Sequence, residues 1–73
     1  SADDLLECIS RLPDGYRTVF NLYAIEGYTH KEIAAMLHIQ EITSRSQFAR
    51  ARKALQEMVQ SLIAQDNVNR NRT

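Results

Sequence analysis

The sequence predicts an all-α fold, a compact four-helix domain, and three features of the chain support this prediction. Apolar residues recur at the three- and four-residue spacing of amphipathic helices, and β-branched runs with period-two alternation are absent. The two glycines and the single proline fall where a helix is expected to begin or end. A chain of 73 residues is one domain or part of one, and a domain of this size rarely encloses a deep catalytic cleft.

The first expected helix covers residues 2–11. Leu5, Ile9 and Leu12 follow i, i+4, i+7 spacing and form one apolar stripe along it. Cys8, the only cysteine, lies beside this stripe and is expected to be a small core residue. A single cysteine can form neither an intramolecular disulfide nor a thiolate zinc site, which fits a reducing, cytoplasmic setting.

The second expected helix covers residues 14–26. Pro13 precedes it, because proline can end one helix and occupy the first turn of the next. Its apolar stripe is wide, so we expect this helix to be the most buried of the four. The stripe comprises Tyr16, Val19, Phe20, Leu22, Tyr23 and Ile25. Gly27 follows at the position where a helix C-terminus favours a positive φ.

A capping box predicts the start of a third, short helix. In this motif the Thr29 hydroxyl accepts a hydrogen bond from the Glu32 amide, and the Glu32 carboxylate accepts one from the Thr29 amide. Residues 38–40 are expected to form a tight turn, and a fourth helix is expected from about residue 41 to residue 65. The apolar face of that helix should comprise Ser44, Phe48, Ala51, Leu55, Met58 or Val59, and Leu62. We expect residues 1–65 to form the domain and the Asn- and Arg-rich residues 66–73 to form a disordered tail.

Charge is unevenly distributed, although the formal net charge is zero. Six acidic and three basic residues precede residue 37, whereas three acidic and six basic residues follow residue 36. The segment from Ile42 to Gln56 contains four basic residues and no acidic residue. Such a polarised field can orient a protein on a polyanion even when the total charge is zero.

The capped helix, the turn and the fourth helix form a helix-turn-helix pattern over about residues 29–50. In this motif the second helix enters the major groove of DNA, and its first turns reach the base edges. Arginine, glutamine, serine and threonine suit base edges, basic residues further along suit phosphates, and the amides at a helix N-terminus favour a phosphate. The predicted DNA-binding residues are Thr29, His30, Lys31, Glu41, Thr43, Arg45, Ser46, Gln47, Ala49, Arg50, Arg52 and Lys53.

Three segments follow one another at the spacing of a known family: residues 12–20 (LPDGYRTVF), 26–34 (EGYTHKEIA) and 46–55 (SQFARARKAL). They resemble the LPxxYRxVF, EGxSxKEIA and SRLxRARxxL segments in the fourth conserved region of extracytoplasmic-function sigma factors. The resemblance covers about residues 5–58. Each segment alone is weakly specific, but all three in order are a strong signal.

The resemblance implies a helix-turn-helix domain of the winged-helix-like, sigma region 4 type that recognises the −35 promoter element in the bacterial cytoplasm. It also implies docking on the flap of the RNA polymerase β subunit and, in many members, sequestration by an anti-sigma factor. The parent protein would have a further region that melts the −10 element, and the start at Ser1 agrees with a fragment of a longer chain. The resemblance places these residues against DNA: Thr43, Arg45, Ser46, Ala49 and Arg50.

The chain departs from the family pattern around the turn. His38 and Gln40 stand where family members usually have glycine and serine. Ile42 stands where glycine is usual, and Ser44 where a β-branched core residue is usual. Gln47 stands where arginine or lysine is common. These departures concern the start of the recognition helix and the DNA sequence it reads, not the overall pattern.

Other interpretations remain open at this point. The basic cluster can be a solvated helix face, and the domain can be a helical interaction module that docks the polymerase flap or an anti-sigma factor. A helix-turn-helix of the response-regulator type is a third alternative. We expect no enzyme, cofactor or metal site, because no nucleophile and base, phosphate loop or cluster of ligands around His30 or His38 stands out. No apolar run approaches the roughly 18 residues of a membrane span.

Overall fold

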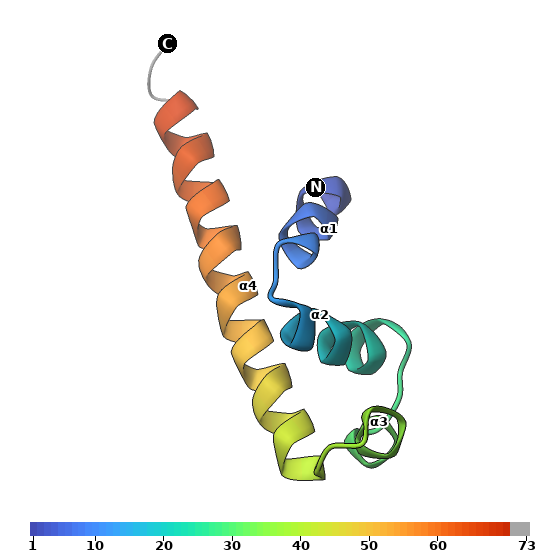
Figure 1. Ribbon diagram of the computed structural model, residues 1–73. Helices are drawn as coiled ribbons and strands as arrows, with labels where there is room; N and C mark the ends of the chain where they lie inside the picture. Colours follow the sequence, from blue (N-terminus) through green and yellow to red (C-terminus); the bar gives the residue numbers. More distant parts are fainter. Residues whose placement is uncertain (71–73) are drawn as a thin grey trace.

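The computed structural model describes residues 1–70, which form four α-helices and one π-helical segment (Figure 1). In chain order the elements are α1 (Ala2–Ser10), α2 (Asp14–Phe20), η1 (Asn21–Ile25), α3 (His30–Leu37) and α4 (Glu41–Arg70). No strand occurs in this part of the chain, so the predicted all-α fold with four helices is confirmed. Helices α1, α2 and α3 all pack against α4, and the C-terminal end of α4 extends beyond them (Figure 1).

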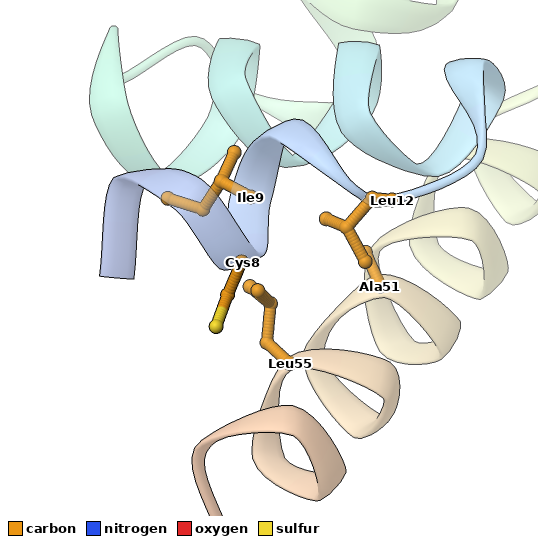
Figure 2. Close-up of a cluster of buried hydrophobic side chains, with 5 residues drawn as sticks. All are labelled: Cys8, Ile9, Leu12, Ala51 and Leu55. Carbon is orange, nitrogen blue, oxygen red and sulfur yellow. The ribbon is translucent and has the colours of Figure 1, made fainter. Parts of the chain in front are cut away.

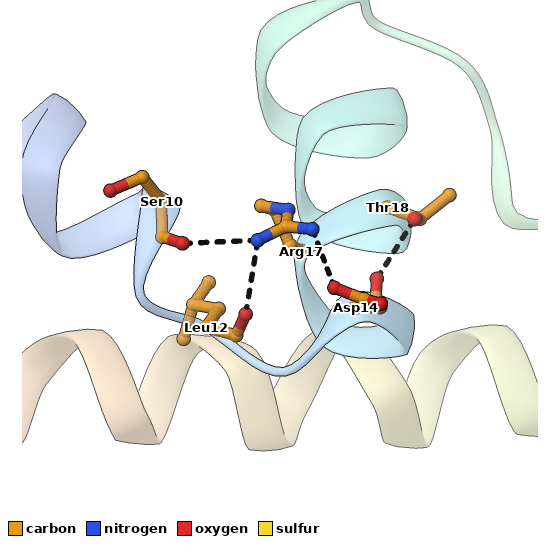
Figure 3. Close-up of polar contacts among 5 residues, drawn as sticks. All are labelled: Ser10, Leu12, Asp14, Arg17 and Thr18. Atoms are coloured by element: carbon orange, nitrogen blue, oxygen red, sulfur yellow. Dashed lines mark hydrogen bonds and ion pairs between the residues drawn. The ribbon is translucent and has the colours of Figure 1, made fainter.

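The connection between α1 and α2 is held by Arg17 (Figure 3). Its guanidinium donates hydrogen bonds to the backbone carbonyls of Ser10, at 3.0 Å, and Leu12, at 3.4 Å. The same guanidinium forms an ion pair with Asp14, and the Thr18 hydroxyl donates to the Asp14 carbonyl at 2.8 Å. Carbonyls at the end of a helix lack partners within it. Arg17 satisfies one of them, that of Ser10, together with the Leu12 carbonyl of the connection, and so helps to fix the angle between α1 and α2.

One cluster of buried hydrophobic side chains lies between the end of α1 and the middle of α4 (Figure 2). Its buried residues are Cys8, Ile9, Leu12, Ala51 and Leu55. Ala51 has no exposed surface, and its single methyl group lets the chain around Leu12 lie close to the α4 backbone. Cys8 is only 3% exposed, so the prediction that it is a core residue is confirmed.

The outermost residues of two predicted apolar stripes are not buried. Leu5 of α1 is 47% exposed and Leu62 of α4 is 41% exposed. Both line an open groove between α1 and the C-terminal half of α4, together with Val59 and Ile63. Periodicity correctly assigned these side chains to the inner sides of their helices. It could not show that the two helices leave a groove between them.

The prediction that the second helix is the most buried is wrong. Of its apolar stripe only Val19 is buried, whereas Tyr23 is 40% exposed and Ile25 is 63% exposed. From Asn21 onward the backbone is π-helical, and the Glu26 amide donates to the Asn21 carbonyl, five residues earlier, at 2.9 Å. The wider turn redirects the side chains that follow. In addition, α3 and α4 cover only part of this segment.

Helix α4 ends later than predicted. It continues through Arg70, so Asp66–Arg70 are helical and do not form the predicted disordered tail. An ion pair of 3.2 Å between Asp66 and Arg70 joins successive turns in the favourable acid-before-base order. Neither glycine nor proline interrupts the helix. The rest of the predicted tail, residues 71–73, lies outside the described residues, and the predicted domain boundary at residue 65 stays a prediction.

Candidate nucleic-acid interface

Helix α3, the turn after it and the start of α4 form a helix-turn-helix. Helix α3 begins at the predicted capping box, in which the Glu32 amide donates to the Thr29 hydroxyl at 3.1 Å and the Thr29 amide donates to the Glu32 carboxylate at 3.0 Å. The bond from the Thr29 amide is the main reason why the pKa of Glu32 is lowered. Helix α3 ends at Leu37, and the residue after it, His38, adopts the left-handed conformation with φ 57° and ψ 45°. Helix α4 begins at Glu41, as predicted.

One face of α4 is buried, and the other sides of its first half are open to solvent. Ser44 and Ala51 have no exposed surface, and Leu55 is 6% exposed. Their spacing of seven and then four residues keeps them on one side of the helix. Six predicted DNA-binding residues lie away from that side and are exposed or half-buried, and we call them the outer face of α4: Arg45, Ser46, Ala49, Arg50, Arg52 and Lys53.

The outer face of α4 is positively charged. Arg45 forms an ion pair of 3.5 Å with Glu41, one helical turn earlier. Arg50, Arg52 and Lys53 form no ion pair with any of residues 1–70. Glu41 is the only acidic residue in this half of α4. The outer face therefore presents largely uncompensated cations, which attract a polyanion.

A comparison with family models decides what kind of helix-turn-helix this is. The family model described as Sigma-70, region 4 matches residues 2–55. The chain belongs to the sigma-70 region 4 family. Region 4 recognises promoter DNA as part of a sigma factor, which works with RNA polymerase, and the match argues against the response-regulator alternative. Searches of curated proteins and of solved structures found no match.

In this region 4 domain the side chain of His30 faces the protein. Its ring stacks on Tyr23, with centroids 4.2 Å apart, and meets the edge of Phe48 at 5.9 Å. Its Nδ1 atom lies 2.8 Å from the Ser44 hydroxyl, so His30 links η1, α3 and α4. Burial, ahead of the nearby Arg45 charge, lowers the pKa of His30. The sequence-based expectation that His30 serves a phosphate is therefore corrected for its side chain.

The contact with His30 explains why serine occupies position 44 in this region 4 domain. Ser44 is the only buried polar residue in the described chain, and its hydroxyl is paired with the His30 ring. An apolar residue at position 44 would leave this ring nitrogen without that partner. Sequence periodicity could not reveal the pair, because the two residues are 14 positions apart.

The side chain of Gln47 also lies away from the outer face, contrary to the prediction for it. Its Oε1 atom is buried and has no hydrogen-bond partner within the described residues. A Cβ atom at Gly15 of α2 would lie 3.5 Å from it. Gln47 and Thr43 line a hollow between α2 and the helix-turn-helix. Position 47 is three residues after Ser44 and four residues before Ala51. Helical periodicity therefore places its side chain on the buried side of α4.

The start of α3 is also less accessible to a phosphate than the sequence of this region 4 domain predicts. The Thr29 amide and hydroxyl are both used in the capping box, which places the Glu32 carboxylate at this helix end. Lys31 is exposed there and carries no ion pair within residues 1–70. Of the predicted residues at this helix start, Lys31 therefore has the side chain best placed for a phosphate.

Residues 1–70 of the region 4 domain contain neither a membrane-spanning helix nor a cluster of metal ligands. None of their helices combines the length and the apolar character that crossing a membrane requires. No group of three or more histidine, cysteine, aspartate or glutamate side chains is placed there to hold a metal ion.

Proposed function

We propose that this domain is region 4 of an extracytoplasmic-function sigma factor and that it binds the −35 promoter element through the outer face of α4. One observation carries the proposal: exposed basic residues succeed one another along α4, away from its buried face. A recognition helix needs this arrangement, because one side holds it to the domain while the other enters the major groove. The three sequence segments quoted above support the subtype.

The roles of the outer-face residues follow from their chemistry. The guanidinium groups of Arg45 and Arg50 offer forked donors to guanine, and the Ser46 hydroxyl can pair with several base edges. Arg52 and Lys53 lie further along α4 and suit phosphates, which position the domain without reading sequence. In the absence of DNA the Arg45 guanidinium is paired with the Glu41 carboxylate at 3.5 Å.

An alternative function is favoured by one separate observation. The groove between α1 and the C-terminal half of α4 leaves Leu5, Leu62 and Ile63 between 41% and 56% exposed. An open apolar surface of this kind is typical of a site that binds another protein. Docking of the polymerase β flap or of an anti-sigma factor is thus a second candidate, and it is compatible with DNA binding.

A salt titration with two matched variants tests DNA binding. The affinity for a labelled duplex with a −35 element, measured by fluorescence anisotropy, should fall with salt at a slope near −0.9 per phosphate contacted. Arg50→Ala should weaken binding by about 1–3 kcal/mol. Arg11→Ala removes the same charge from an exposed site directly after α1 and should have a much smaller effect. Equal losses of DNA affinity in both variants, or an affinity that does not depend on salt, would refute DNA binding by α4 and leave only the docking function.

A further inference from the structure

Ile42 is the most exposed large apolar side chain in the described chain. It is the second residue of α4, and 66% of its surface is exposed. Single exposed apolar residues are common on protein surfaces, so exposure alone indicates little. Its position is more informative, because the first turn of a recognition helix is the part that reaches base edges.

The helical phase places Ile42 among the outer-face residues. It lies two residues before the fully buried Ser44, which directs the two side chains to nearly opposite sides of α4. Ser46 and Ala49 follow it at i+4 and i+7, so they share its side of the helix. Arg45, one turn later, adds a positive charge beside it. Ile42 is thus an apolar group at the leading end of a basic, solvent-facing surface.

The chemistry of Ile42 restricts what it can recognise in a major groove. Its side chain has no donor or acceptor, so it cannot pair with the polar edges of adenine, guanine or cytosine. Thymine alone presents an apolar group there, the C5-methyl, which apolar side chains contact. We propose that Ile42 selects a thymine in the recognised DNA by packing against this methyl group. The inference rests on the proposed function of α4 as the recognition helix.

Replacing thymine by deoxyuridine tests this contact, because the two bases differ only by the C5-methyl. The 73-residue chain would first select its preferred duplexes from random DNA, and each thymine in them would then be replaced in turn. We expect one replacement to weaken binding about fourfold, which corresponds to losing one buried methyl group. In Ile42→Ala the same replacement of thymine by deoxyuridine should change the affinity by less than about 1.5-fold, because the side chain that packs on the methyl group is gone.

Ile25→Ala is the matched control, because Ile25 is also an isoleucine, lies in η1 outside both proposed binding surfaces and is 63% exposed. This variant should keep the fourfold effect of the methyl group. Alanine has a higher helix propensity than isoleucine, so both variants should remain folded, which circular dichroism would verify.

The outcomes separate this inference from the function on which it rests. Salt-dependent binding to selected duplexes without a sensitive thymine, or with a sensitivity that persists in Ile42→Ala, would overturn the thymine contact and leave DNA recognition by α4 intact. The absence of any selected sequence and of salt-dependent binding would overturn both. A fourfold methyl effect that disappears only in Ile42→Ala would support both.

Discussion

The substitution Gln47→Met tests a specific feature of the structure, a buried carbonyl oxygen without a partner. The Oε1 atom of Gln47 is buried between α4 and Gly15 of α2 and accepts no hydrogen bond within the described residues. A buried acceptor left unsatisfied costs about 1–3 kcal/mol. Methionine has a similarly unbranched side chain and a similar helix propensity, but it lacks the polar atoms. We therefore expect the free energy of unfolding to rise by about 1 kcal/mol.

Urea and thermal denaturation, followed by circular dichroism, measure this change. For a domain of this size the melting temperature should rise by about 4–8 °C per kcal/mol. Gln60→Met is the matched control, because Gln60 is exposed on the same helix and its replacement should leave stability unchanged. If Gln47→Met is no more stable than Gln60→Met, the carbonyl is not unpaired in solution and the reasoning is refuted. DNA affinity should be unchanged in Gln47→Met, and a clear loss of affinity would show that Gln47 contacts DNA.

Three other changes address the core, the turn before α3 and the His30 contact. Ala51→Leu should destabilise the domain by about 1–3 kcal/mol because it overfills a site with no exposed surface, whereas Ala49→Leu, at an exposed site on α4, should not. Gly27→Ala should lower the free energy of unfolding, measured by urea denaturation, by about 1–2 kcal/mol. Gly27 has a φ of 81° and a Cβ added there would meet no atom within 4 Å, so the loss would come from backbone strain alone. An unchanged urea midpoint would contradict this. Because the pKa of His30 is lowered by burial and by Arg45, the folded state prefers the neutral ring. Stability should therefore be full above the unfolded pKa of about 6.5 and decline as the pH falls from there toward the folded pKa, and this decline should disappear in His30→Phe. An identical pH profile in the two proteins would show that His30 is not its source.

Local patterns in the sequence were sufficient for most of the fold. The capping box at Thr29 and the start of α4 at Glu41 depend on residues within a few positions of one another. The buried face of α4 followed from spacing alone, and Ser44 and Ala51 lie on it as expected. The π-helical segment was missed, because the sequence carries no local signal that separates it from a continuing α-helix.

The interface shows the same division between local and long-range information. Spacing along one helix placed Arg45 and Arg50 on its accessible side. The orientation of His30 depends on its contact with Ser44, 14 positions away in the sequence, whereas spacing along α4 already directs Gln47 toward Gly15 of α2. Periodicity within one helix could not predict the contact between His30 and Ser44.

The amino-acid sequence by itself determined the helical fold, the helix-turn-helix and the charge of its second helix, because these depend on propensities and spacing over one or two turns. Tertiary structure alone decided which side chains within that motif remain free to meet DNA. It turned the His30 ring inward, against Tyr23 and Ser44, and buried the carbonyl oxygen of Gln47 close to Gly15. The physical reason is that burial results from the packing of several helices, and that packing is set by residues far apart in the chain.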